Sequence, residues 1–234
     1  MLNFRNVSFS YKRNQPVLTG FDLEFRPGNT LLLGPNGAGK STVFALASGA
    51  LRPKTGTIER TASVGLLTQQ VPIFPQLTAW QQVAYVAWLA MKPMKQAEKD
   101  AMAALRQVGL FEKAQEKPKN LSGGQLRRLG IAGLLNSDAS VMLLDEPTAG
   151  LDIAQCASFY STLKNLDQGK TVIVCTHQID GITDYFDFVV VIVNGELLFN
   201  DTMAKFIELG NLPQNQYSSN PLVNAYSELV ATKE

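Results

Sequence analysis

The pentapeptide Leu121-Ser122-Gly123-Gly124-Gln125 constrains this chain more than any other segment, because very few folds contain it. It lies between a glycine-rich loop at 34–41 and an acidic pair that follows the apolar run 141–144. Many folds carry a phosphate-binding loop, but few combine one with this pentapeptide. Ser122 is also a good helix N-cap, so we predict a helix from the pentapeptide to about residue 135.

The glycine-rich loop follows a short apolar strand at 30–33 and opens a helix predicted to reach about residue 48, which is the context of a phosphate-binding loop. Its residues are Gly34, Pro35, Asn36, Gly37, Ala38, Gly39, Lys40 and Ser41. Glycines let successive backbone N–H groups turn toward phosphates, and the helix N-terminus adds partial positive charge. We expect Lys40 to reach the β- and γ-phosphates and the Ser41 hydroxyl to bind Mg²⁺.

An acidic pair and a histidine follow two further apolar runs. Asp145 ends the first run, so its carboxylate is expected beside the phosphates, holding Mg²⁺ through water. His177 is the only histidine of the chain and follows the run 171–175 by one residue. By itself an acidic pair after a strand is more often a turn, and a histidine at a strand end is more often structural. The upstream glycine loop and the downstream histidine favour the catalytic interpretation of the acidic pair.

In order and spacing, these motifs resemble the ATP-binding-cassette (ABC) ATPase family from end to end. The resemblance implies an α/β fold, a RecA-like P-loop NTPase core with an antiparallel β-subdomain and an inserted helical subdomain. We therefore expect an ABC ATPase domain over 1–209, with the helical subdomain at about 78–135, and a short C-terminal tail over 210–234.

The same resemblance implies roles for single residues in ATP hydrolysis. Glu146 would activate the attacking water, and His177 would donate a hydrogen bond to the γ-phosphate. Gln69 would be the glutamine that contacts Mg²⁺ and the water, with its neighbour Gln70 as the alternative.

Two more residues match positions that hold the nucleotide in the family. Tyr11, placed on the turn after the first strand, resembles the aromatic residue that stacks on adenine, and Thr42 would contact the α-phosphate. A stacked ring accepts any flat base, so this contact supplies affinity more than selectivity. The alternative for Tyr11 is an ordinary surface tyrosine.

Two cassettes of the family pack head to tail, so the pentapeptide of one completes the nucleotide site of the other. Ser122 and the backbone of Gly124 would meet the partner's γ-phosphate, flanked by Gly123 and Gln125, and Asp152 resembles part of the D-loop that crosses the same interface. The alternative for the pentapeptide is a capped helix start with flexible glycines.

The rest of the chain reads as alternating strands and helices. Helical spacing over 78–114 is interrupted at Pro93, and the dipeptide Asn194-Gly195 predicts a hairpin turn. Further strands are predicted at 2–9, 21–25, 64–67, 171–175, 188–193 and 196–199, a further helix at 153–166, and a short helical end at 224–231.

Composition excludes several classes of protein. With 45% hydrophobic and 18% charged residues the chain can bury a core, and a net charge of +1 gives no field for nucleic acid. Cys156 and Cys175 are expected to be free, buried thiols, which fits a reducing compartment. The most apolar helix candidate, at 79–91, falls short of the about 20 residues that span a bilayer. The N-terminus lacks the build of a signal peptide.

These observations predict a Mg²⁺-dependent ATPase that works as a homo- or heterodimer. We expect it to power transport through a separate transmembrane permease subunit, from the cytoplasmic face of the cell membrane. The absence of a C-terminal regulatory domain and the segment 77–89 favour export over sugar import. The alternative is a soluble ABC ATPase that remodels an assembly such as an iron-sulfur cluster scaffold. A nucleic-acid machine is disfavoured, because such chains add a coiled coil or a second cassette.

Overall fold

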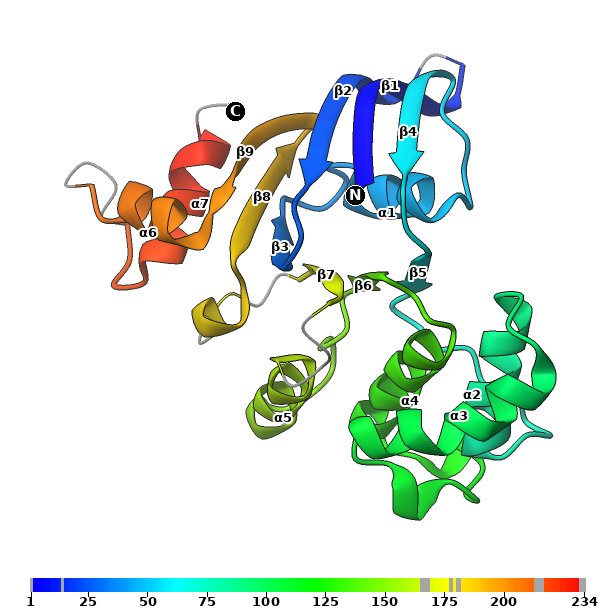
Figure 1. The fold of residues 1–234 in the computed structure, drawn as a ribbon. Coiled ribbons are helices and arrows are strands. Elements are labelled where there is room, and N and C mark those ends of the chain that lie inside the picture. The colour runs from blue at the N-terminus through cyan, green and yellow to red at the C-terminus, as the bar shows by residue number, and fades with distance from the viewer. Residues whose placement is uncertain are drawn as a thin grey trace. The chain divides into compact units, whose positions relative to one another are not determined.

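The chain divides into two units, seen in a computed structural model that describes residues 2–13, 15–164, 169–176, 179, 182–212 and 217–231. The core unit consists of Met1–Ala62 and Thr171–Glu234, and the helical unit of Ser63–Lys170. Figure 1 shows the elements of each unit in order along the chain.

An antiparallel sheet in the core unit is built from the N-terminal alternating pattern. Its strands are β1 (Leu2–Lys12), β2 (Gln15–Phe25) and β4 (Thr55–Arg60), in the order β2-β1-β4. Along β1, Leu2, Phe4, Val7 and Phe9 are buried. Phe4 meets the rings of Phe21 and Phe25 edge to face, with centroids 5.9 and 6.5 Å away. Each such ring pair stabilises the fold by about 0.5–1.5 kcal/mol beyond burial.

The core unit also contains four neighbouring strands in the order β7-β3-β8-β9. β3 (Asn29–Leu33) lies parallel to β7 (Thr171–Cys175) and β8 (Phe188–Val193), and β9 (Glu196–Thr202) returns antiparallel beside β8. The apolar residues of β3, β7 and β8 form unbroken runs because these strands are buried on both faces. The remaining elements are η3 (Thr183–Tyr185) and the helices α1 (Lys40–Ser48), α6 (Met203–Gly210) and α7 (Pro221–Ala231).

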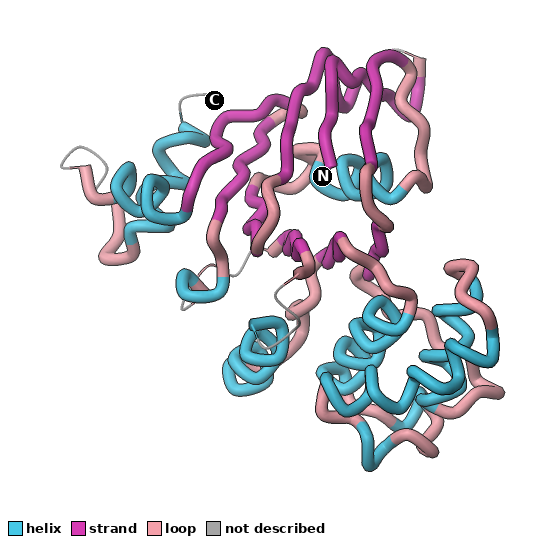
Figure 2. Tube along the Cα trace, in the orientation of Figure 1, coloured by secondary structure: helices cyan, strands magenta, loops and turns pink. Residues whose placement is uncertain are grey.

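The helical unit combines two parallel strands with packed helices (Figure 2). The strands are β5 (Val64–Leu67) and β6 (Val141–Asp145). Helices α2, α3 and α4 pack against one another through alanines and leucines, such as Ala87, Ala101 and Leu129. The helices are α2 (Ala79–Leu89), α3 (Met94–Gln107), α4 (Gly123–Asn136) and α5 (Ile153–Lys164), with the short η1 (Phe111–Lys113) and η2 (Pro118–Asn120).

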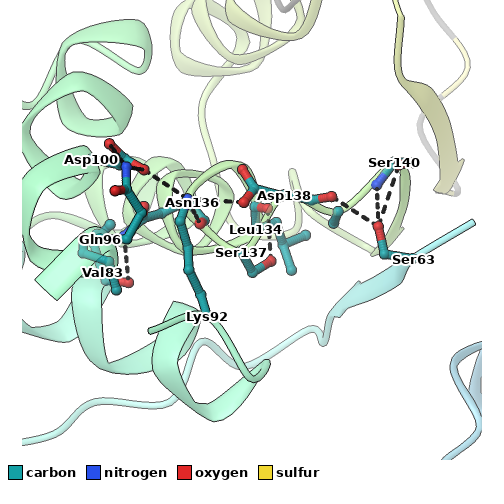
Figure 3. Close-up of polar contacts among 12 residues, drawn as sticks. Ser63, Val83, Lys92, Gln96, Asp100, Leu134, Asn136, Ser137, Asp138 and Ser140 are labelled. Atoms are coloured by element: carbon teal, nitrogen blue, oxygen red, sulfur yellow. Dashed lines mark hydrogen bonds and ion pairs between the residues drawn. The ribbon is translucent and has the colours of Figure 1, made fainter. Parts of the chain in front are cut away.

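A polar cluster ties α2, α3 and α4 together (Figure 3). The Lys92 ammonium, between α2 and α3, lies 2.9 Å from Asp100 and 3.0 Å from Asp138, and it donates to the carbonyl of Asn136 at 2.8 Å. The buried Asn136 amide donates to the carbonyl of Ala97 on α3 at 2.8 Å and to that of Val83 on α2 at 3.3 Å. We name this set of contacts the Lys92 cluster.

Several predicted elements are confirmed, and others need correction. The strand at 64–67 and the Asn194-Gly195 hairpin lie where predicted. The two cysteines form no disulfide, as expected, but only Cys175 is buried, and Cys156 is half-buried. The first strand extends past residue 9 to Lys12, because it pairs with β2 up to the turn.

The helix candidate predicted at 79–91 extends too far. The helix ends at Leu89, and Met91 adopts a left-handed φ of 72°, which turns its side chain out to 90% exposure. β4 and α6 were not predicted from the sequence. In β4 only Ile58 is even half-buried, so this strand has no apolar alternation to detect.

Candidate functional site

The glycine-rich loop in the core unit connects β3 to α1. Gly37 and Gly39 have left-handed φ values of 83° and 102°, which side chains rarely adopt. Gly39 is the N-cap of α1 and offers no side-chain hydrogen bond to the helix. Because the first N–H groups of a helix have no partner within it, the start of α1 presents donors and a partial positive charge to an anion.

The Lys40 ammonium lies against this loop. It donates to the carbonyls of Gly34 at 2.7 Å and Pro35 at 2.9 Å, and the residue is 7% exposed. A bound phosphate would be a stronger acceptor for the ammonium than these neutral carbonyls. The loop therefore joins backbone donors with a nearby cation, and the fit to a polyphosphate such as that of ATP is good.

A bound Mg²⁺ would need oxygen ligands from a hydroxyl, from the nucleotide phosphates and from water, in addition to any carboxylate. Ser41, in the first turn of α1, is exposed and its hydroxyl can reach a cation. Within the described part of the chain, no group of three or more His, Cys, Asp or Glu residues forms a metal site. Mg²⁺ is commonly bound by one or two protein oxygens together with substrate phosphates and water.

Tyr11 is the aromatic residue that the structure places next to this loop. Its hydroxyl lies 3.2 Å from Thr42 Oγ1 on α1, and its ring meets Phe9 edge to face at 5.0 Å. The side chain is 65% exposed, so a ring face is open to stacking. Tyr11 lies within β1 and not on a turn, and the structure brings it together with Thr42 as two predicted nucleotide contacts.

The pentapeptide in the helical unit starts α4 with reciprocal hydrogen bonds. Ser122 Oγ accepts from the Gln125 N–H at 3.3 Å, and Gln125 Oε1 accepts from the Ser122 N–H at 2.9 Å. This capping box satisfies the N–H groups of Ser122 and Gln125. The N–H groups of Gly123 and Gly124 lie between them at the helix start. The predicted cap is confirmed.

A pocket of about 310 Å³ lies beside this helix start, between α4 and α5. Asp152 lines it and caps α5, with Oδ1 accepting the Gln155 N–H at 2.7 Å. Burial, with a further contribution from the Asp152 charge, raises the pKa of the Cys156 thiol nearby. The thiol is therefore protonated at neutral pH and is no nucleophile. The pocket is lined by Ser122, Gly124, Arg128, Leu151, Asp152, Ala154, Gln155, Ser158 and Phe159.

The acidic pair and the candidate glutamine follow adjacent strands of the helical unit. β5 and β6 pair in parallel, with Leu67 opposite Leu144, so both strands end at the same edge. Asp145 is the last residue of β6 and Gln69 follows β5 as an exposed residue. Glu146 turns the chain with a left-handed φ of 47°. His177 lies outside the described residues.

One contact that holds the phosphate-loop helix was not predicted. The guanidinium of Arg60, on β4, donates to the carbonyls of Leu46 and Ala47 at the C-terminal end of α1, the latter at 2.6 Å. A cation at this end of a helix is stabilising because the last carbonyls carry partial negative charge. A single arginine in an exposed strand gives no sequence signal for this role.

No helix within the described ranges is both long and apolar enough to cross a membrane.

The comparisons with known proteins agree with these motifs. The family model described as ABC transporter matches residues 18–149. The energy-coupling factor transporter ATP-binding protein EcfA of Methanosphaera stadtmanae is 33% identical over 221 residues, which cover 86% of this chain and 79% of that protein. The methionine import ATP-binding protein MetN of Carboxydothermus hydrogenoformans is 30% identical over 219 residues, covering 85% of this chain and 65% of that protein.

Solved structures extend the likeness to three dimensions. cbiO1 from Clostridium perfringens, part of the ABC transporter complex cbiONQ, has a TM-score of 0.79 and 26% identity, covering 97% of this chain and 98% of that one. The ATP-binding cassette MJ0796, a dimer in a post-hydrolysis state bound to ADP and Pi, has a TM-score of 0.75 and 26% identity, covering 87% and 99%. The chain therefore belongs to the ABC transporter family, with the RecA-like P-loop fold of its cassettes, and is an ATPase that uses ATP with Mg²⁺.

Proposed function

We propose that this chain is the ATP-hydrolysing subunit of a membrane transporter, that it works as a dimer, and that it powers uptake through a separate membrane protein. The observation that carries the nucleotide part is the uncapped start of α1 with the Lys40 ammonium against its loop. The transport part is supported by relatives named as transporter subunits. Export finds no support among them, and one relative, MetN, is named as an import protein.

The residues of each unit have separate tasks in this proposal. In the core unit, Lys40 and the loop N–H groups bind the phosphates and the Ser41 hydroxyl is a ligand for Mg²⁺. In the helical unit, Gln69 and, through water, Asp145 are further candidate ligands for Mg²⁺. Bound Mg²⁺ supplies positive charge against the charge that develops on the phosphates. Glu146 accepts the proton of the attacking water.

The start of α4 acts on the nucleotide of the second subunit. A second phosphate-binding helix start would be redundant for the same phosphates, whereas Ser122 and the Gly124 N–H can complete a site across an interface, with Asp152 crossing the same interface. The dimeric state of the similar cassette MJ0796 supports this arrangement.

Mixed dimers test the arrangement. Lys40→Ala should weaken nucleotide binding within its own subunit, whereas Ser122→Arg should leave binding by the monomer nearly intact and block ATP-dependent dimerisation. In a mixture, each mixed dimer concentrates both defects in one site and leaves the other intact, so ATPase activity should rise above the sum of the two variants. Ser161→Arg, at an exposed position of α5, is the control for an added charge. A mixture that never exceeds the sum would contradict the head-to-tail dimer.

The membrane partner is proposed to dock at the corner of α2 and α3. Four large apolar residues are exposed there within a short stretch of chain, which is more than the singly scattered apolar residues of an ordinary surface. The exposed fractions are 45% for Trp88, 54% for Leu89, 90% for Met91 and 38% for Met94. Tyr85 is a poor site for a test, because it stacks on Trp88 at 5.6 Å and packs against Phe74. Docking here would place the chain at the membrane surface as a peripheral subunit.

Leu89→Asp tests the docking surface. The variant should stay folded and keep the ATPase activity of the isolated subunit, while its association with membranes and its support of transport are lost. Ile153→Asp, at a residue exposed to 91% on α5, is the matched control. A folded Leu89→Asp variant that still binds membranes refutes the docking surface. A wild-type protein that never co-fractionates with membranes favours the soluble remodelling ATPase instead.

A further inference from the structure

A distant hairpin turn contacts the glycine-rich loop. The N–H of Gly195, in the turn between β8 and β9, donates to the carbonyl of Ala38 at 3.0 Å. The two residues are far apart in sequence, and both belong to the core unit. The turn is therefore an external support of the loop and not part of it.

The approach of the turn leaves no room for side chains. Gly195 has a φ of 76°, and a Cβ on it would lie 2.0 Å from the carbonyl oxygen of Val17 on β2. A Cβ on Gly34, at the other end of the loop, would lie 2.1 Å from the carbonyl oxygen of Ile192 on β8. The backbone of the hairpin thus lies against β2 at Gly195 and against the loop at Gly34, and only glycine fits at each.

The hydrogen bond from Gly195 sets the orientation of one peptide unit of the loop. In a planar trans peptide the C=O and the following N–H point in opposite directions. Holding the Ala38 carbonyl toward the hairpin therefore directs the N–H of Gly39 to the opposite side. Gly39 has a φ of 102°, and a glycine has the freedom to turn this peptide over if nothing holds it.

We propose that Gly195 is a positioning residue for phosphate binding: its N–H holds the 38–39 peptide so that the Gly39 N–H faces the bound phosphates. The inference rests on the proposed role of the loop. The Ala38 side chain is buried and its N–H donates to Pro35 at 3.2 Å, so two hydrogen bonds and packing fix this residue. Loss of the Gly195 contact frees the peptide to present its carbonyl, which repels an anion.

Gly195→Ala tests the inference, because the added Cβ forces the turn away from Val17 and breaks the contact. The measurement is the affinity for Mg-ADP by titration calorimetry. We expect about ten- to hundredfold weaker binding, the effect of losing one hydrogen bond to a charged group. The amide resonance of Gly39 should shift on addition of Mg-ADP in the wild type and shift less in the variant.

Two controls separate positioning from stability. Gly20→Ala places a side chain at another left-handed glycine of the core unit, with φ 58°, where the atom nearest to the added Cβ is Asn6 Oδ1 at 3.3 Å and not an atom of the loop. Asn194→Gly keeps the turn and the N–H of residue 195. Both should bind Mg-ADP as the wild type does.

Each outcome gives a decision. A wild-type protein that does not bind Mg-ADP overturns the proposed function itself. If the wild type binds and a folded Gly195→Ala variant binds equally well, the positioning role is wrong. If Gly195→Ala does not fold, an amide-to-ester replacement at residue 195 removes the donor without adding a methyl group. Undiminished binding by that ester overturns the inference, and weakened binding supports it.

Discussion

Replacement of Lys92 by methionine would remove the ammonium at the centre of the Lys92 cluster while keeping an unbranched side chain only one heavy atom shorter. Only 9% of the Lys92 side chain is exposed, and its ammonium contacts Asp100, Asp138 and the Asn136 carbonyl at 2.8–3.0 Å. Methionine keeps the apolar stem but loses all three contacts. Asp138 contributes little, since its side chain is 74% exposed and hydrated in the variant.

The magnitude follows from the least exposed of these contacts. The Asn136 carbonyl at the end of α4 loses a charged donor, and a hydrogen bond to a charged group is worth about 1.5–3 kcal/mol. We therefore expect Lys92→Met to lower the free energy of unfolding of the helical unit by about 2 kcal/mol near neutral pH. Lys95→Met, at an exposed lysine of α3, should change it by less than about 0.5 kcal/mol.

The pH dependence has a definite sign. Burial by itself would lower the pKa of Lys92, but hydrogen bonds and charges from Asp100 and Asp138 raise it above the ordinary value. Its stabilising effect is therefore complete below the unfolded pKa of about 10.4 and lost as pH rises through the folded pKa. The hydrogen bond from Gln96, followed by that from Lys92, lowers the pKa of Asp100. The stabilising contribution of Asp100 is therefore present above its unfolded pKa of about 3.9 and lost as pH falls through its folded pKa.

Urea unfolding followed by tryptophan fluorescence measures this directly, because both tryptophans, Trp80 and Trp88, lie in the helical unit. The difference between wild type and Lys92→Met should be largest between about pH 5 and 9 and shrink toward about pH 3. A difference no larger than that of Lys95→Met at neutral pH, or one independent of pH, would refute the stabilising role of the cluster.

Three further predictions concern the nucleotide site and its support. Glu146→Gln should keep ATP binding but cut turnover by roughly two to four orders of magnitude, the scale of lost acid-base help; near-normal hydrolysis in a phosphate-release assay would remove Glu146 from that role. Tyr11→Ala should raise the KM for ATP by about tenfold or more through lost stacking, whereas Tyr11→Phe keeps the ring and should stay close to wild type; equal KM values for both variants would show that the ring does not stack. Arg60→Ala removes the two hydrogen bonds at the end of α1 and should lower the free energy of unfolding by about 1–2 kcal/mol in denaturant titrations, more than loss of the exposed Arg5–Glu59 pair in Arg5→Ala. An equal effect of the two arginines would contradict the capping role.

Local patterns predicted many elements of the fold. The glycine-rich loop, the capping box of Ser122 and Gln125, and the strand at 64–67 depend on residues that are neighbours in the chain. A glycine at a left-handed position or a serine before a helix carries its reason within a few residues. These features could therefore be located from the sequence, although the roles of the site residues stay predictions.

Distant contacts decided the rest. Lys92 meets Asp138, Arg60 meets the end of α1, and Gly195 meets Ala38, each across more than ten residues. None leaves a periodic signal, because a buried hydrogen bond depends on where two backbones converge and not on the composition of either segment. The position of Met91 was also decided by the backbone. Its apolar side chain fits the helical spacing but lies in solvent, because α2 ends at Leu89 and Met91 itself adopts a left-handed conformation. The sequence by itself determined the family and the local elements, and the tertiary structure decided which polar groups support the phosphate loop and which apolar residues remain open to a partner.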